Sequence, residues 1–145
     1  MTLRTIAART LAPFITIFLL LTFYGQSDAQ TISDSSFRTI GYIKSDGTIQ
    51  DHTFRTTGHI KSDGTVQDHR FRTVAFLKDD GKVQDSSFRI IGYIKNDGTV
   101  QDASFRTVGH IKDDGIVQDA SFRTIGHIKG VPKKWAALYF FFGIR

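Results

Sequence analysis

The 145-residue chain contains no cysteine, no glutamate and only two prolines. Without cysteine it cannot form a disulfide framework, a thiolate metal site or a cysteine-linked lipid anchor. All 14 acidic side chains are aspartates, and they stand against 19 lysines and arginines for a formal net charge of +5. Hydrophobic residues make up 40% of the chain, which is enough for a core and too much for a disordered protein. The length suits one small domain and excludes a multidomain enzyme.

Residues 1–29 predict a secretory signal peptide. Arg4 and Arg9 precede an apolar run over residues 11–24, and small residues then precede Gln30 at the spacing that a signal peptidase needs. The run of about 14 residues is shorter than the ~20 that cross a bilayer as a helix. We therefore expect cleavage before Gln30 and an exported protein, periplasmic or secreted. The alternative is an uncleaved N-terminal membrane anchor.

A repeat with a period of 17 residues fills the chain between residues 30 and 129. Phenylalanine recurs at this step and arginine follows it each time, at Phe37, Phe54, Phe71, Phe88, Phe105 and Phe122. Asp-Gly recurs five times at the same period, with Gln-Asp shortly after it. The period is too short for a propeller blade of ~40 residues or a helical pair of ~33. It suits one β-hairpin.

Each repeat predicts a long strand, a turn and a short strand. Residues 38–44 are rich in β-branched and aromatic side chains, and the Asp-Gly pair that follows is typical of tight hairpin turns. The first short strand and the last long strand lack a partner adjacent in sequence. Pairing these two strands would close an all-β barrel of ten to twelve short strands. A β-solenoid is the alternative, and closure with five or six units stays open.

An apolar segment follows the repeats. Pro132 lies in a linker and prevents simple continuation of the last strand, and residues 135–142 are apolar throughout. Eight residues are too few to span a bilayer. We expect this segment, as helix or strand, to plug the barrel, while a membrane-interface anchor and a partner contact are the alternatives. The chain thus divides into a signal peptide at 1–29, a hairpin-repeat barrel at 30–129 and an apolar C-terminal segment at 130–145.

The repeat RTIGYIKSDGTIQD at 38–51 and the ending GVPKKWAALYFFFG at 130–143 resemble the five-fold β-flower proteins of bacteria. The resemblance covers about 115 residues and implies a shallow, pseudo-symmetric barrel whose hairpins splay like petals. This shape is similar to the Tubby C-terminal domain, a closed barrel around an apolar helix, and some Tubby-like domains bind anionic lipids. Two features depart from the pattern. Ala75 replaces the glycine of the other repeats, and phenylalanine occupies the corner before arginine, where a smaller turn residue is expected.

One register position carries a ring in every repeat: Tyr42, His59, Phe76, Tyr93, His110 and His127. Three histidines can bind zinc, but the position accepts phenylalanine and tyrosine equally, which favours packing or ligand stacking. Together with Trp135 and Tyr139, these residues are the candidate ligand contacts.

The aspartates predict turns and corner caps. Calcium loops need several oxygen ligands at alternating positions, whereas a lysine stands two residues before each Asp-Gly pair here. Acid–base catalysis needs two carboxyls in different environments, and a symmetric repeat gives each aspartate nearly the same surroundings. We therefore predict no enzymatic activity, no catalytic residue, no metal and no cofactor.

The charge of the repeats is nearly balanced, which together with secretion argues against a nucleic-acid partner. We expect a non-enzymatic module of the cell envelope that binds lipid or another apolar ligand through the barrel mouth and the apolar tail. Membrane contact would be at most peripheral. The alternative is a purely structural or protein-interaction module of the envelope, without a small ligand.

Overall fold

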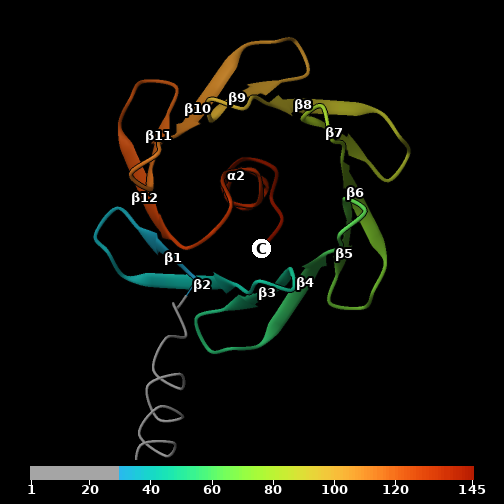
Figure 1. Cartoon of the computed structure of the whole chain (residues 1–145), viewed down its shortest axis with the longest axis horizontal. Helices are drawn as coiled ribbons and strands as arrows, with labels where there is room; N and C mark the ends of the chain where they lie inside the picture. Colours follow the sequence, from blue (N-terminus) through green and yellow to red (C-terminus); the bar gives the residue numbers. More distant parts are fainter. Residues whose placement is uncertain (1–29) are drawn as a thin grey trace, which may run out of the picture.

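The computed structural model describes residues 30–145, and the predicted signal peptide at 1–29 lies outside the described residues. Within this part of the chain, twelve antiparallel strands close into a barrel around one helix (Figure 1). The order of the strands around the barrel follows the chain. This arrangement confirms the all-β barrel predicted from the repeat, and it closes with six hairpins.

The strands contain four to six residues each and alternate between shorter and longer. They are β1 (Thr31–Asp34), β2 (Thr39–Ile43), β3 (Thr48–Asp51), β4 (Thr56–Ile60), β5 (Thr65–Asp68), β6 (Thr73–Leu77), β7 (Lys82–Asp85), β8 (Ile90–Ile94), β9 (Thr99–Asp102), β10 (Thr107–Ile111), β11 (Ile116–Asp119) and β12 (Thr124–Lys129). The helix is α2 (Lys133–Phe141).

Two kinds of tight connection alternate around the barrel. Asp-X-X-Phe-Arg corners join β1 to β2, β3 to β4 and so on, and they form the outward petal tips in Figure 1. In each corner the phenylalanine N–H donates to the aspartate carbonyl, at 3.0–3.1 Å. Lys-X-Asp-Gly turns join one petal to the next, and their glycines have φ between 85° and 90°. The Asp-Gly turns are therefore present as predicted, at the opposite ends of the strands from the petal tips.

The barrel closes between its first and last strands. β1 pairs with β12 in antiparallel register, with Ile32 opposite Ile128 and Ser33 opposite His127. The predicted pairing of the first short strand with the last long one is confirmed. Closure leaves no free sheet edge among the described strands, and a free edge is where sheets aggregate.

The core is a layer of isoleucine and valine side chains, buried between the barrel wall and α2. Its fully buried side chains are Ile32, Ile43, Ile49, Ile60, Ile94, Ile111, Leu138, Val66, Val83, Val100 and Val117. Repeats at the same register thus supply an apolar ring at the same level of the barrel. A helix in its centre removes the void that this ring would otherwise enclose.

Helix α2 fills that space, as predicted for the apolar tail, and residues 136–139 are buried. Its end and the residue after it place four consecutive aromatic rings against glycines of four petals: Tyr139 on Gly41, Phe140 on Gly126, Phe141 on Gly109 and Phe142 on Gly92. A Cβ atom at Gly109 would lie only 2.2 Å from the Phe141 ring. In these four petals, both the tail ring and a cross-strand carbonyl oxygen leave no room for a Cβ atom, so the close approach of the helix adds to the need for glycine.

Ala75 occupies the glycine position in the third petal. The three atoms nearest to a Cβ at the neighbouring Gly58 belong to Gln67 and Ile49 and not to a tail ring, so this sector of the barrel is less crowded. Ala75 is itself buried, and β6 pairs with β5 and β7 in the same register as its counterparts. The departure at Ala75 therefore leaves the petal intact, because the aromatic rings are directed at other petals.

Candidate functional site

Six phenylalanines stand at the petal tips. Their side chains are 63–73% exposed, and their φ angles of 62–65° lie in the left-handed region that glycine favours. An L-residue in this region costs about 1–2 kcal/mol. Strained backbone of this kind persists where the surrounding structure enforces it, and it often marks a functional position.

An aspartate enforces each corner. In the second petal, Asp51 Oδ1 accepts hydrogen bonds from the N–H groups of Thr53 and Arg55, at 2.8 and 3.1 Å. Its Oδ2 accepts a third from Arg55 Nε at 3.0 Å. The Thr53 hydroxyl and these donors hold the pKa of Asp51 well below its usual range. The carboxylate thus stays charged and fixes both the turn and the arginine.

Each tip phenylalanine stacks on the ring of the preceding petal. The pairs are Phe37–His127, Phe54–Tyr42, Phe71–His59, Phe88–Phe76, Phe105–Tyr93 and Phe122–His110, with centroids 3.9–5.0 Å apart and planes within 15°. All six ring residues singled out in the sequence therefore lie beneath a phenylalanine. They form six separate pairs around the barrel, and each pair joins two petals.

The histidines of the ring do not come together. His59, His110 and His127 each belong to a different stacked pair. Among residues 30–145, no three histidine or aspartate side chains are close enough to hold a metal ion. The arrangement therefore gives no support to a three-histidine zinc site.

The structure separates the two tail candidates. Tyr139 is 6% exposed, and its hydroxyl donates to the Ile40 carbonyl at 3.3 Å, so it is part of the core. Burial raises its pKa. Trp135 lies in the first turn of α2 and is only partly buried, beside Lys134 and the turns at 61–64 and 78–79.

An arginine accompanies every tip phenylalanine. The arginine side chains are 67–82% exposed, while a guanidinium nitrogen of each lies 2.8–3.0 Å from the corner aspartate. Each tip thus presents an exposed guanidinium, held by the corner aspartate, on the residue that follows an exposed phenylalanine. In the sequence these phenylalanines define the repeat, and they depart from the usual chemistry of a tight turn, but they were not among the candidate site residues. That conflict between a bulky residue and a tight corner was the signal that could have identified them.

The side chains at the tips have a chemistry that suits contact with a surface or ligand. The repeat places six equivalent tips around the closed barrel, and Figure 1 shows the petals directed outward from its centre. A stacked ring offers apolar area, and a guanidinium offers donors that suit phosphate or carboxylate. No helix within residues 30–145 is long and apolar enough to cross a membrane.

A family model described as 5-fold beta-flower protein matches residues 29–143. No curated protein and no solved structure matches the chain. The matched range includes all twelve strands and α2. It also includes both segments that carry the resemblance seen in the sequence. The chain therefore belongs to the five-fold β-flower family, and its own barrel closes with six hairpins.

Proposed function

We propose that this β-flower protein is a non-enzymatic, exported module that attaches to the lipid surface of the cell envelope through its petal tips. The tip phenylalanines carry the proposal. Glycine would fit their backbone conformation without strain, yet all six corners hold a phenylalanine that is 63–73% exposed. Six repetitions of a strained, exposed ring indicate that the ring itself is useful.

The interior of the barrel is filled, which favours a lipid contact on its outside. Helix α2 occupies the space in which a lipid chain would otherwise lie, and four of its residues are buried there. A contact through the barrel mouth and the tail would require the helix to leave its place. The petal tips need no such rearrangement. We therefore place the lipid contact at the tips, and not at the barrel mouth and tail where the sequence predicted it.

Interfacial binding suits the chemistry of the tips. Phenylalanine is among the residues by which interfacial segments enter the surface of a bilayer, and arginine is attracted to anionic headgroups. A single tip binds weakly, because its arginine is already paired with an aspartate. Several tips that engage one surface add their contributions without new contacts, which is the gain of multivalent binding.

The test measures co-flotation of the purified protein with vesicles of phosphatidylcholine, alone or mixed with phosphatidylglycerol. We expect binding to both, with tighter binding to the anionic mixture. The triple variant Phe54→Gly, Phe88→Gly and Phe122→Gly should bind at least tenfold more weakly while staying folded, because glycine fits the corner. Ser36→Gly, Ser87→Gly and Ser121→Gly are the matched control, since they change three exposed corner residues and keep every ring. Unchanged binding of the phenylalanine variant would contradict the proposal.

The stacked pairs also favour a second candidate, a purely structural or protein-interaction module. Each pair joins two petals, so the rings could serve mainly to hold the barrel together. This alternative expects no vesicle binding by the unchanged protein. It also expects the triple glycine variant to lose stability in a urea titration.

A further inference from the structure

The tail fills the barrel unevenly. Its four rings at 139–142 lie against the glycines of the first, fourth, fifth and sixth petals, so the adjacent second and third petals face the residues after the helix. There Gly143 has a φ of 72°, and the Ile144 N–H donates to the Leu138 carbonyl oxygen at 3.3 Å. The chain therefore turns back and ends inside the ring of strands (Figure 1), with Ile144 in the core.

A hollow of about 200 Å³ remains in this sector, between the second and third petals and the residues after α2. Its apolar wall includes Val74, Ile91, Phe142 and Ile144. An engineered apolar cavity of about 150 Å³ holds one benzene molecule. Pockets for drug-sized ligands have ~300–1,000 Å³. The hollow therefore suits a single small ring and excludes a lipid chain.

The second and third petals also depart from the repeat at the position before the glycine. In the other four petals this position holds a β-branched apolar residue that packs against the core: Ile40, Ile91, Val108 and Ile125. The second petal has Thr57 there, and the third has Val74, which is 39% exposed. The two petals without a tail ring are thus also the two whose side chains at this position leave the sector open.

Two polar side chains of the wall are available to a ligand. The Thr57 hydroxyl donates to the Ile49 carbonyl oxygen at 3.4 Å, which leaves its lone pairs free to accept. In three petals the equivalent of Gln67 donates to the carbonyl oxygen of the tip phenylalanine at 3.2 Å: Gln50, Gln84 and Gln118. Within residues 30–145, Gln67 makes no such bond, so its amide can pair with a ligand.

The charges of the wall favour a neutral ligand. Asp68 and Arg145 line the hollow and have opposite signs. The Asp68 carboxylate is already paired with the Arg72 guanidinium at 2.8 Å. Neither sign therefore dominates, and an ion would lose its hydration without a matching charge.

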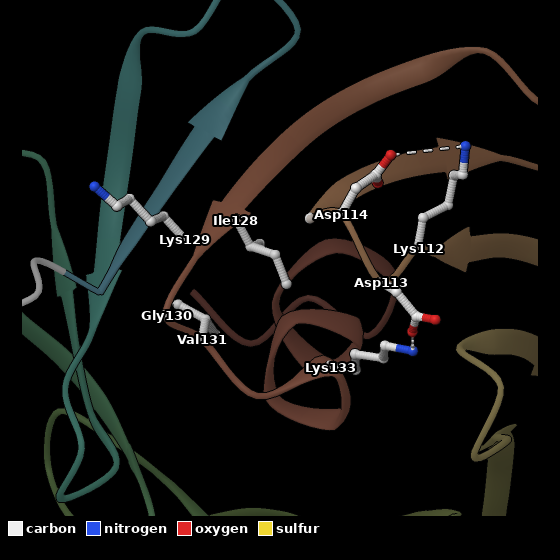
Figure 2. A pocket seen from close by; sticks show the side chains of 9 residues that line it. Lys112, Asp113, Asp114, Ile128, Lys129, Gly130, Val131 and Lys133 are labelled. Carbon is white, nitrogen blue, oxygen red and sulfur yellow. Dashed lines mark hydrogen bonds and ion pairs between the residues drawn. The ribbon is translucent and has the colours of Figure 1, made fainter.

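A hollow at the opposite end of the barrel has a different chemistry. Figure 2 shows Lys133 directed at the Asp113 carboxylate, with which it forms an ion pair. Lys112 Nζ lies 4.0 Å from Asp114 Oδ2 beside it. An apolar ligand there would have to displace paired charges, whereas the hollow beside Ile144 offers it an apolar wall.

We propose that the hollow between the second and third petals binds one neutral, single-ring compound that carries a hydroxyl or carbonyl group. The ring packs against Ile91, Phe142 and Ile144, and the polar group pairs with the Gln67 amide and the Thr57 hydroxyl. Helix α2 stays in place when this ligand binds. The site is independent of the attachment of the petal tips to a lipid surface.

The test titrates the purified protein with benzyl alcohol and with toluene, and it follows the heat of binding and the methyl NMR signals of Val74, Ile91 and Ile144. Benzyl alcohol should bind saturably and shift all three signals. Toluene should bind about three- to tenfold more weakly, because it lacks the hydroxyl. Gln67→Leu should remove most of this difference between the two probes. Gln101→Leu, the equivalent change in β9, is the matched control and should preserve it.

A second pair of variants tests the hollow itself. Thr57→Ile with Val74→Ile gives both petals the residue that the first petal has at Ile40, so the barrel should stay folded while the hollow fills. The Kd for both probes should rise about tenfold or more. Val108→Ile enlarges the equivalent position of a petal that holds a tail ring, and it should leave both Kd values unchanged. Absence of saturable binding, or binding that leaves the three methyl signals unmoved, would overturn the site. Equal effects of the filling variant and its control would overturn it as well.

Discussion

At the petal tips, phenylalanine occupies a backbone conformation in which glycine is more stable. The φ angle of Phe88 is 65°, and its ring stacks on Phe76 with centroids 4.9 Å apart. The strain costs about 1–2 kcal/mol, and an aromatic pair returns about 0.5–1.5 kcal/mol beyond its buried area. Because these two effects are of similar size, the stack contributes little net stability beyond that of the area it buries.

This balance predicts different results for two substitutions at one tip. Phe88→Ala keeps the strained φ and loses the stack, so it should lower the free energy of unfolding by about 0.5–1.5 kcal/mol. Phe88→Gly loses the stack but relieves the strain, so its free energy of unfolding should lie within about 1 kcal/mol of the unchanged protein. Urea titrations of both variants provide the measurement. A glycine variant less stable than the alanine variant would show that the ring is held without strain.

The same residues mark the limit of prediction from sequence. The register of Tyr42, His59 and their equivalents followed from the period, because repeats in one register place equivalent residues at one level. Their partners did not follow, since Phe54 stacks on Tyr42 of the preceding petal and this contact depends on how the petals lean together. The positive φ of the tips likewise depends on a hydrogen-bonded corner that residue type alone does not reveal.

At the scale of elements, the match between α2 and the barrel wall explains the repeat glycines. A Cβ at Gly109 would lie 2.2 Å from the Phe141 ring and 2.6 Å from the Gln118 carbonyl oxygen. A Cβ at Gly58 would meet the Gln67 carbonyl oxygen at 2.7 Å and no aromatic ring. The two positions are equivalent in the repeat, and they differ in what the helix places against them.

Gly109→Ala should therefore destabilise the barrel more than Gly58→Ala. We expect about 1–3 kcal/mol for Gly109→Ala, the usual effect of overpacking a filled core. The Gly58 variant should lose less, because Ala75 already shows that a petal away from the rings accepts a methyl group. Chemical denaturation of both variants measures the two free energies of unfolding and tests this difference. Equal losses would mean that the strand backbone, and not the helix, requires glycine.

The helical form of the tail could not be read from its sequence. A helix with one buried face shows a period of 3.6, but a helix surrounded by a barrel is apolar on all sides. The run at 135–142 therefore carried no periodic signal, and its length suited either a strand or a helix. Its location in the barrel was predictable, because an apolar segment must be buried and the interior of a ring of strands must be filled.

At the scale of the whole molecule, the number of strands predicted that the barrel would close. All six petals share one electrostatic interaction, which is the hydrogen-bonded aspartate at each corner. The pKa of every corner aspartate is lowered from 3.8: Asp34, Asp51, Asp68, Asp85, Asp102 and Asp119. For Asp34 the largest cause is the N–H of Arg38, which donates to the carboxylate. The six shifts have the same direction, so their effects on folding accumulate.

These lowered pKa values predict acid unfolding. A carboxyl that is more acidic in the folded state binds fewer protons there, so the unfolded state gains protons first as the pH falls. The stability that the corners contribute is complete above about pH 5, and it declines as the pH falls through 3.8 toward the folded pKa values. Urea midpoints between pH 2.5 and 7 should show this decline. Asp34→Asn with Asp51→Asn should make it shallower, whereas Asp79→Asn, which removes a charge from an exposed turn, should not. An unchanged slope in the double variant would locate the acid sensitivity outside the petal corners.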